Sequence, residues 1–253
     1  MIEYQSLLSI ALAAAERACQ EILTVYNSGD FQAEVKGDNS PLTIADKRAH
    51  SVIASILEST NLPVLSEEGK TVPYEERNDW EYFWMVDPLD GTKEFLKRNG
   101  EFTVNIALIH SGRPVLGVVA VPVTGDVYYA SDEGAFLRRG RTEKKLSHRG
   151  RIDLQQAGLR VVASRSHLNE DTQQFINSLQ RPSLVSSGSS LKFMLLAEGS
   201  ADVYPRFAPT MEWDTAAAHA IVNAVGLKVI RQGSQEELVY NKMDLLNPGF
   251  VVC

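Results

Sequence analysis

The chain has 253 residues, of which 44% are hydrophobic and 23% are charged, enough for one large or two small domains with a substantial core. Its formal net charge is −7, which disfavours non-specific binding to nucleic acid or to an anionic membrane. The two cysteines, Cys19 and Cys253, have no CxxC neighbour, so we expect neither a disulfide framework nor a zinc site.

The Ala-rich start of the chain is not expected to be a secretory leader. The segment from Ile10 to Ala15 is short, lacks a basic flank before it and runs directly into Glu16 and Arg17. No apolar run reaches the roughly 18 residues that a membrane-spanning helix needs. We therefore expect no transmembrane segment.

The first half of the chain reads as two helices followed by strands. Apolar residues from Leu7 to Val25 recur at three- and four-residue spacing, which predicts an amphipathic helix ending near Gly29. A second helix is expected from about Asp46 to Leu57. Short apolar runs then predict strands at 63–65, 82–86, 102–109, 115–121, 127–130 and 135–137. The order predicts an α+β half.

The pattern changes after the basic stretch 138–151, for which we predict no regular element. Strands are expected at 159–163, 183–186, 202–204, 228–230 and 250–252, and helices at 169–179, 189–197 and 213–224. Alternating strands and helices predict an α/β half. We place the boundary near residue 157, which divides the chain into segments 1–157 and 158–253.

The strand predicted at 82–86 leads directly into the acidic segment Asp87-Pro88-Leu89-Asp90-Gly91-Thr92. Pro88 restricts φ and Gly91 permits unusual backbone angles, so we predict a rigid turn with two carboxylates. Mg²⁺ prefers oxygen ligands of this kind, although a solvated acidic turn is the alternative on composition alone. An aspartyl-phosphate mechanism is excluded, because it requires acids two residues apart and these are three apart.

This segment resembles the DP-[LI]-DGT signature of the inositol monophosphatase superfamily. Trp213 to Ala217 is similar to the second signature of that superfamily, and Glu67-Glu68 to its acidic pair, in the family's order. Thr92 to Phe95 and Asn99 to Asn105 resemble most the bacterial 3′(2′),5′-bisphosphate nucleotidases within it. The resemblance implies a layered α-β-α-β-α sandwich of the sugar-phosphatase type.

The resemblance also implies a site for two or three Mg²⁺ ions. Its expected ligands are Glu67, Asp87, Asp90, Asp214 and the carbonyl of Leu89. Asp214 should lie in the first turn of its helix, where a carboxylate is favoured by the helix dipole. Simple helix capping is the alternative for Asp214, and an exposed acidic loop is the alternative for Glu67.

Three residues are expected to handle the attacking water. Glu67 and Thr92 should position it, and Asp46 should accept a hydrogen bond or a proton from Thr92. The alternative role for Asp46 is to cap the second helix, and the two roles are compatible.

Substrate contacts are expected largely from the second half. A helix start flanked by Ser, Gly and Lys can bind an anion, although Ser and Gly also cap helices and His167 could be a surface residue. Arg165, Lys192 and Arg206 supply three cations in an acidic protein, which favours a doubly phosphorylated ligand. The expected substrate contacts are Glu67, Leu89, Asp90, Gly91, Thr92, Ser164, Arg165, His167, Gly188, Ser189, Lys192, Arg206 and Asp214.

The leading hypothesis is a lithium-sensitive, Mg²⁺-dependent bisphosphate nucleotidase. It would convert adenosine 3′,5′-bisphosphate to AMP and phosphate with an activated water and no covalent intermediate, recycling a nucleotide of sulfur assimilation. The resemblance implies a cytoplasmic enzyme, with some relatives found at the inner membrane face. The alternatives are an inositol- or sugar-phosphate phosphatase and a non-catalytic metal- or nucleotide-binding regulator. The sequence leaves the oligomeric state open.

Overall fold

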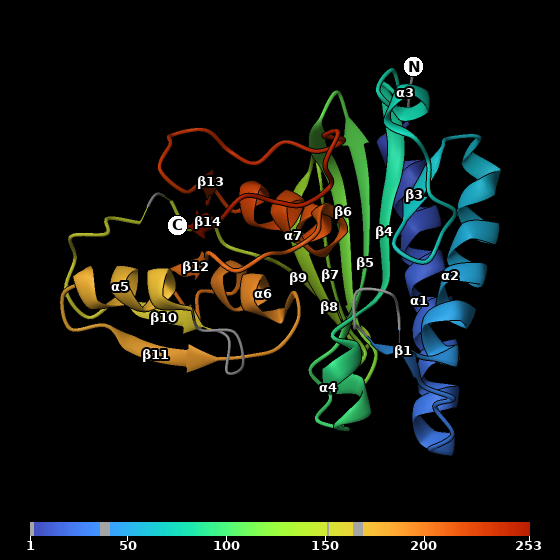
Figure 1. Cartoon of the computed structure of the whole chain (residues 1–253), viewed down its shortest axis with the longest axis horizontal. Helices are drawn as coiled ribbons and strands as arrows, with labels where there is room; N and C mark the ends of the chain where they lie inside the picture. Colours follow the sequence, from blue (N-terminus) through green and yellow to red (C-terminus); the bar gives the residue numbers. More distant parts are fainter. Residues whose placement is uncertain (1–2, 36–40, 151, 164–168) are drawn as a thin grey trace.

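A large, mostly antiparallel sheet forms the centre of the N-terminal half (Figure 1). The structure is a computed structural model that describes residues 3–35, 41–150, 152–163 and 169–253. β3 and β4 are parallel, and every other neighbouring pair is antiparallel. Within the described residues the strands are, in spatial order, β3 (Val64–Ser66), β4 (Tyr82–Asp90), β5 (Thr103–His110), β6 (Arg113–Val121), β7 (Asp126–Ser131), β8 (Gly134–Arg139) and β9 (Thr142–Lys145).

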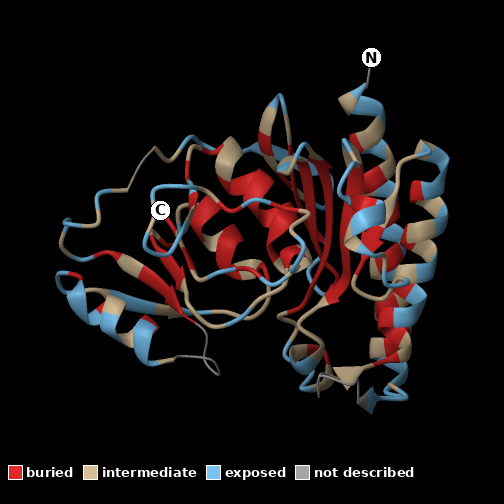
Figure 2. Ribbon diagram, turned by 45° about the horizontal axis from the view of Figure 1, so that its top comes forward, coloured by how far each residue is buried: buried red, intermediate tan, exposed pale blue. Residues whose placement is uncertain are grey.

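Two long helices cover one face of this sheet. They are α1 (Tyr4–Ser28) and α2 (Ile44–Leu57), and the short pair β1 (Glu34–Val35) and β2 (Pro41–Leu42) lies between them in sequence. Their buried residues recur at the spacing expected of amphipathic helices and face the sheet (Figure 2). α1 ends at Gly29, whose φ of 75° places it in the left-handed region.

The opposite face of the sheet is covered by α7 (Glu212–Ala224), with α6 (Leu191–Ala197) beside it. Small residues let α7 approach the sheet closely. A Cβ atom on Gly117 of β6 would lie only 2.2 Å from the carbonyl oxygen of Ala217 and 2.9 Å from the Cβ of Ala220. This contact therefore sets the distance between α7 and the sheet. It also sets the position of the first turn of α7, which contains Asp214.

A second sheet lies beyond α6 and α7. β12 (Tyr204–Arg206), β14 (Phe250–Val252) and β13 (Val229–Arg231) form one part, and β10 (Arg160–Ala163) with β11 (Ser183–Ser186) forms the other. A bridge between Val161 and Val203 joins them. α5 (Glu170–Ser178) packs on the outer face. The layers follow the order helix, sheet, helix, sheet, helix, as the sequence predicts.

Several elements differ from the prediction. β4 continues to Asp90 instead of ending at residue 86, and β12 begins at Tyr204, two residues later than expected. The stretch 138–151, for which no element is predicted, contains the edge strand β9, whose charged residues are exposed and so lack the alternating signal of a half-buried strand. The short helices α3 (Tyr74–Arg77), α4 (Thr92–Leu96) and the 3₁₀ turn η1 (Glu58–Thr60) are also not predicted.

The hydrophobic core between the large sheet and α7 takes residues from both sides of residue 157, such as Phe83, Val119, Ile221 and Val252. The division near residue 157 stays a prediction. A search of the described helices finds none that combines the length and the apolar character needed to cross a membrane.

Candidate active site

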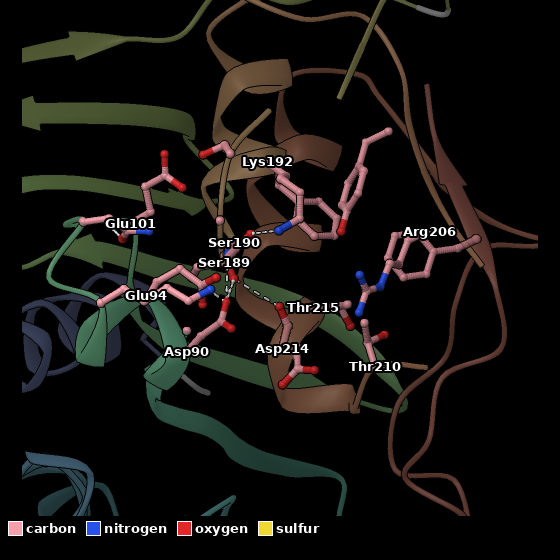
Figure 3. Close-up of a pocket in the computed structure, with 18 residues that line it drawn as sticks. Asp90, Glu94, Glu101, Ser189, Ser190, Lys192, Arg206, Thr210, Asp214 and Thr215 are labelled. Carbon is pink, nitrogen blue, oxygen red and sulfur yellow. Dashed lines mark hydrogen bonds between the residues drawn. The ribbon is translucent and has the colours of Figure 1, made fainter. Parts of the chain in front are cut away.

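A cavity of about 270 Å³ opens where the end of β4 meets the starts of α6 and α7 (Figure 3). It brings together residues that are widely separated in sequence. Its lining includes Asp90, Gly91, Glu94, Lys97, Asn99, Glu101, Ser187, Gly188, Ser189, Ser190, Lys192, Phe193, Tyr204, Arg206, Thr210, Asp214, Thr215 and Phe250.

The last residues of β4 have an irregular strand geometry that exposes Asp90 to this cavity. The pairing of β4 with β5 shifts register between Asp87 and Asp90, because Pro88 has no N–H to give to the ladder. The backbone N–H of Leu89 donates to Asp87 Oδ1 over 3.0 Å. Gly91 then has a φ of 93°, in the region that favours glycine. The predicted rigid turn is therefore a bulged strand end followed by a left-handed glycine.

Asp90 is held by the start of α6. Its Oδ2 accepts hydrogen bonds from Ser189 Oγ at 2.6 Å, the Ser190 backbone N–H at 2.7 Å and Ser190 Oγ at 2.8 Å. Sequence reasoning expected this helix start to bind an anion of the substrate. The anion that the Ser190 backbone N–H binds is instead the carboxylate of Asp90. Ser189 and Ser190 therefore hold a residue of the acidic site in place.

Two buried polar residues of β5 support this contact. Thr103 Oγ1 lies 2.6 Å from Ser189 Oγ, and Asn105 Nδ2 donates to Ser190 Oγ over 2.9 Å. Both residues are at most 1% exposed. Sequence reasoning assigned them no role, although the run Asn99–Asn105 carried part of the resemblance. Polar side chains inside a strictly buried strand were the signal that could have identified them.

Glu67, Asp87, Asp90 and Asp214 gather around the same point. The Glu67 backbone N–H donates to the Val86 carbonyl over 3.1 Å, which places Glu67 beside the end of β4. Burial raises the pKa of Asp87 well above its usual range, and the charges of Glu67, Asp90 and Asp214 raise it further. The pKa of Asp214 is also raised, first by burial and then by the charge of Asp90. Two buried carboxyl groups whose pKa is raised by neighbouring carboxylates form a site that a cation would stabilise.

Asp214 lies in the first turn of α7, as predicted. Its Oδ2 accepts the backbone N–H of Met211 over 2.8 Å, so it also caps the helix. The capping alternative and a ligand role therefore coexist in the geometry.

The donor chemistry of this cluster fits a hard divalent cation such as Mg²⁺, which prefers carboxylate and carbonyl oxygens. The described hydrogen bonds use one oxygen each of Asp87, Asp90 and Asp214. Among the described residues, no group of three acidic, histidine or cysteine side chains is already arranged to hold an ion. The match to Mg²⁺ thus rests on the type and the mutual repulsion of the donors.

Asp46 and Thr92 meet next to the acidic cluster. Thr92 Oγ1 lies 3.3 Å from both Asp46 Oδ1 and the carbonyl oxygen of Leu89. Thr43 is the N-cap of α2, and its N–H and Oγ1 donate to Asp46 Oδ2 over 2.7 and 2.6 Å. Asp46 is therefore the third residue of the helix and not its N-cap, and it takes part in capping as the acid of a capping box. Burial raises the pKa of Asp46.

Two cations face the acids across the cavity (Figure 3). Lys192 is 7% exposed, and its Nζ donates to the Ser189 carbonyl over 2.8 Å. Burial lowers the pKa of Lys192 to about 8. Arg206 donates from Nη2 to the Pro209 carbonyl over 3.1 Å, while its buried Nε has no hydrogen-bond partner within the described part of the chain.

Gly188 allows the loop before α6 to approach the cavity wall, because a Cβ atom there would lie 2.9 Å from the carbonyl oxygen of Glu101. Of the other expected substrate contacts, Ser164, Arg165 and His167 lie outside the described residues. The cavity also includes Glu94, Glu101 and Thr210, which sequence reasoning did not select.

Comparison with known proteins identifies relatives over almost the whole chain. The sequence model of the Inositol monophosphatase family matches residues 3–252. The 3′(2′),5′-bisphosphate nucleotidase CysQ of Salmonella typhimurium is 46% identical over 243 residues, which cover 94% of this chain and 96% of that protein. The protein of the same name from Escherichia coli (strain K12) is 45% identical over the same length, which covers 94% of this chain and 96% of that protein.

Solved structures give the same result. CysQ from Bacteroides thetaiotaomicron, described as a bacterial member of the inositol monophosphatase family, superimposes with a TM-score of 0.87 at 47% identity, covering 98% of this chain and 97% of that one. An IMPase from Thermotoga maritima shares the fold with a TM-score of 0.78 at 20% identity, covering 99% and 92% of the two chains. The layered fold predicted from the sequence is confirmed.

Proposed function

The chain belongs to the inositol monophosphatase family, and we propose that within it the protein is a 3′(2′),5′-bisphosphate nucleotidase. It is a phosphatase that converts adenosine 3′,5′-bisphosphate to AMP and inorganic phosphate. This role recycles a nucleotide by-product of sulfur assimilation in the cytoplasm. The high identity to nucleotidases over more than nine tenths of the chain supports this assignment.

The observation that carries the proposal is the distribution of charge along one cavity. Asp90 and Asp214 lie at one end, where metal ions would hold the phosphate that is cleaved, and Lys192 and Arg206 lie across from them. A ligand with a single phosphate would leave the buried charge of Lys192 with only the carboxylates of Asp90, Glu94 and Glu101 near it, and no phosphate. A ligand with two phosphates satisfies both ends.

The proposed ligands of two or three Mg²⁺ ions are Glu67, Asp87, Asp90, Asp214 and the carbonyl oxygen of Leu89. Bound Mg²⁺ supplies positive charge beside the phosphate and makes a nearby water more acidic. The contribution of the chain is to hold the acids in place. Ser190 and its neighbours fix Asp90, and the start of α7 fixes Asp214.

Asp46 and Thr92 supply the proton path for the attacking water. Thr92 and Glu67 orient the water, whose proton passes to Thr92 Oγ1 as the Thr92 hydroxyl proton passes to Asp46 Oδ1. The raised pKa of Asp46 favours this transfer, because burial makes the carboxylate a stronger base. The water oxygen bonds to phosphorus, the bond from phosphorus to the 3′ oxygen breaks, and the leaving oxygen takes a proton from solvent.

The two halves have separate tasks in this proposal. Residues 1–157 carry most of the acidic site, while residues 158–253 complete it with Asp214 and bind the rest of the nucleotide. The second phosphate and the ribose are bound by Lys192, Arg206 and Gly188, together with Ser164, Arg165 and His167.

Phosphate release with Mg²⁺ should be measured from adenosine 3′,5′-bisphosphate, inositol 1-phosphate and fructose 1,6-bisphosphate. The bisphosphate nucleotide should give the highest kcat/KM, and millimolar Li⁺ should inhibit its hydrolysis. A preference for inositol 1-phosphate or fructose 1,6-bisphosphate would replace the proposed substrate while leaving the phosphatase class intact. No release from any of the three would indicate a non-catalytic protein.

A further inference from the structure

A buried chain of hydrogen bonds runs from the wall of the proposed active-site cavity to the far side of α7. Thr215 Oγ1 lies 3.2 Å from Tyr240 Oη, which lies 2.9 Å from His219 Nδ1. His219 Nε2 lies 3.1 Å from Glu237 Oε2. Thr215 lines the cavity and directly follows Asp214. The chain therefore connects the turn that carries a proposed metal ligand to a distant carboxylate.

The direction of the hydrogen bonds follows from their ends. Glu237 accepts from Lys228 Nζ at 2.6 Å and from Asn223 Nδ2 at 3.0 Å, and His219, Lys228 and Asn223 together hold the pKa of Glu237 at about 2. An ionised carboxylate can only accept. His219 must then donate from Nε2, and burial lowers the pKa of its ring, so Nδ1 carries no proton and accepts from Tyr240.

At the cavity end, the Thr215 hydroxyl has one donor and two acceptors within reach. Asn247 Nδ2 donates to Thr215 Oγ1 over 3.0 Å, and the Thr215 hydroxyl is within reach of Tyr240 Oη and of the Glu212 carbonyl, at 3.2 and 3.1 Å. When the Thr215 hydroxyl donates to Tyr240 Oη and not to the Glu212 carbonyl, donation runs in a single sense from Asn247 through Thr215, Tyr240 and His219 to Glu237.

Apart from Glu237, the members of the chain are buried, so water cannot readily replace a bond lost among them. Thr215, His219, Tyr240 and Asn247 are each at most 5% exposed. They come from α7 and from the loop between β13 and β14, and the Tyr240 backbone N–H is in turn bonded to the Gly112 carbonyl on the rim of the large sheet. The chain therefore fixes the rotation of the first turn of α7 relative to both sheets.

We propose that Glu237, His219 and Tyr240 are positioning residues, which hold Thr215 and thereby Asp214 in the orientation that the metal and the substrate require. This inference rests on the proposed function for the expected effect on catalysis. The expected effect of these residues on Mg²⁺ binding can be measured without substrate. Ligand-supporting residues of this kind typically contribute 10- to 100-fold to metal affinity or activity.

Tyr240→Phe is the decisive variant, since it removes one oxygen and keeps the buried ring. The matched control is Tyr128→Phe. Tyr128 lies on β7 of the large sheet and its hydroxyl donates to Glu198 at the end of α6, and neither residue lines the cavity. The thermal midpoint of each protein should be followed during a Mg²⁺ titration without substrate. Tyr240→Phe should raise the half-saturating Mg²⁺ concentration about 10-fold, at the low end of the usual range for such supports, and Tyr128→Phe should not.

Glu237→Ala tests the far end of the chain without making a hole in the core, since the Glu237 side chain is 18% exposed. Glu237→Ala should raise the half-saturating Mg²⁺ concentration, as Tyr240→Phe does. Glu237→Gln keeps an acceptor for His219, so its half-saturating Mg²⁺ concentration should be close to that of the wild-type protein. The imidazole ¹⁵N shifts of His219 should report a proton on Nε2 in the wild-type protein.

Equal Mg²⁺ affinities in the wild-type protein, Tyr240→Phe and Glu237→Ala would overturn the inference, as would a proton on Nδ1 of His219 or a wild-type midpoint that does not respond to Mg²⁺. Failure to hydrolyse the bisphosphate would count against the proposed function alone, because the Mg²⁺ titration and the ¹⁵N shifts use no substrate.

Discussion

Thr92 and Asp46 lie 46 positions apart in the chain, yet Thr92 Oγ1 is 3.3 Å from Asp46 Oδ1. The other oxygen of Asp46 is occupied by two donors of Thr43, both from the N-cap of α2. The capping box therefore orients the carboxylate so that one oxygen faces Thr92. The same residue serves local helix structure and the proposed proton path.

The first prediction tests this pair. In Asp46→Asn the amide oxygen should turn to the Thr43 donors, so that an N–H₂ group faces Thr92 and no longer accepts its proton. Asp46→Asn and Thr92→Val should each lower kcat about 10²- to 10⁴-fold, the range for a lost general base, with KM nearly unchanged. The double variant should be little worse than the poorer single variant. Losses that multiply in steady-state kinetics would rule out a shared path.

The second prediction concerns Asp90. Asp90→Asn can keep an oxygen for the three donors of Ser189 and Ser190, but it puts an N–H₂ group in place of the other oxygen and removes one charge from the acidic cluster. It should raise the half-saturating Mg²⁺ concentration at least 10- to 100-fold. Asp126→Asn is the control, because Asp126 of β7 pairs with Arg139 of β8 and neither residue lines the cavity. Unchanged Mg²⁺ dependence in Asp90→Asn would remove Asp90 from the metal site.

The third prediction concerns Lys192 and pH. Burial lowers its pKa from 10.5 to about 8, so Lys192 is cationic below pH 8 and becomes neutral as the pH rises through that value. KM for the bisphosphate should therefore increase between about pH 7 and pH 9. Lys192→Arg should flatten this profile, because arginine stays charged throughout. A profile that is the same in both proteins would contradict a phosphate contact.

The fourth prediction separates the role of the cations from general stability. Lys192→Ala and Arg165→Ala should each lower kcat/KM for the bisphosphate about 10- to 150-fold, since a charge-assisted hydrogen bond contributes about 1.5–3 kcal/mol. A minimal substrate with one phosphate should be spared. Equal losses on both substrates would show that these residues are structural and would favour an inositol phosphatase.

The fifth prediction concerns His219 and acid stability. Burial lowers the pKa of His219 below 6.5, so below pH 6.5 the unfolded chain binds a proton that the folded protein does not. The free energy of unfolding should therefore fall as the pH drops from 6.5, by at most about 1.4 kcal/mol per pH unit for one group. Glu237, with its pKa lowered to about 2, stabilises the fold above pH 4.5 and loses this effect only at lower pH.

Urea unfolding at pH 7.5 and pH 5.5 checks this window, and His219→Gln is the comparison because it keeps a donor and an acceptor. The pH dependence should be shallower in His219→Gln than in the wild-type protein. An equal slope in both proteins would mean that His219 does not titrate in this range.

The sequence by itself was sufficient for the class of fold and for locating the acidic segment at the end of β4. Helix α1 has a strong apolar periodicity because one face is buried, and the central strands of the large sheet are continuous apolar runs because helices cover both faces. The segment Asp87–Thr92 combines a strand end, two carboxylates, Pro88 and Gly91, and that local composition has few structural explanations. These features depend on neighbours in sequence, so they can be read without knowing what packs on them.

Only the tertiary structure decided how the site is supported. Nothing near Asp90 in sequence indicates that Ser189 and Ser190, a hundred residues away, donate to it, or that Asn105 holds Ser190 in turn. The close contact of Gly117 with Ala217 sets the position of α7, and the partners of His219 come from a separate loop. Long-range hydrogen bonds and van der Waals contacts form between surfaces that only folding brings together, and a single sequence carries no local periodicity that records them.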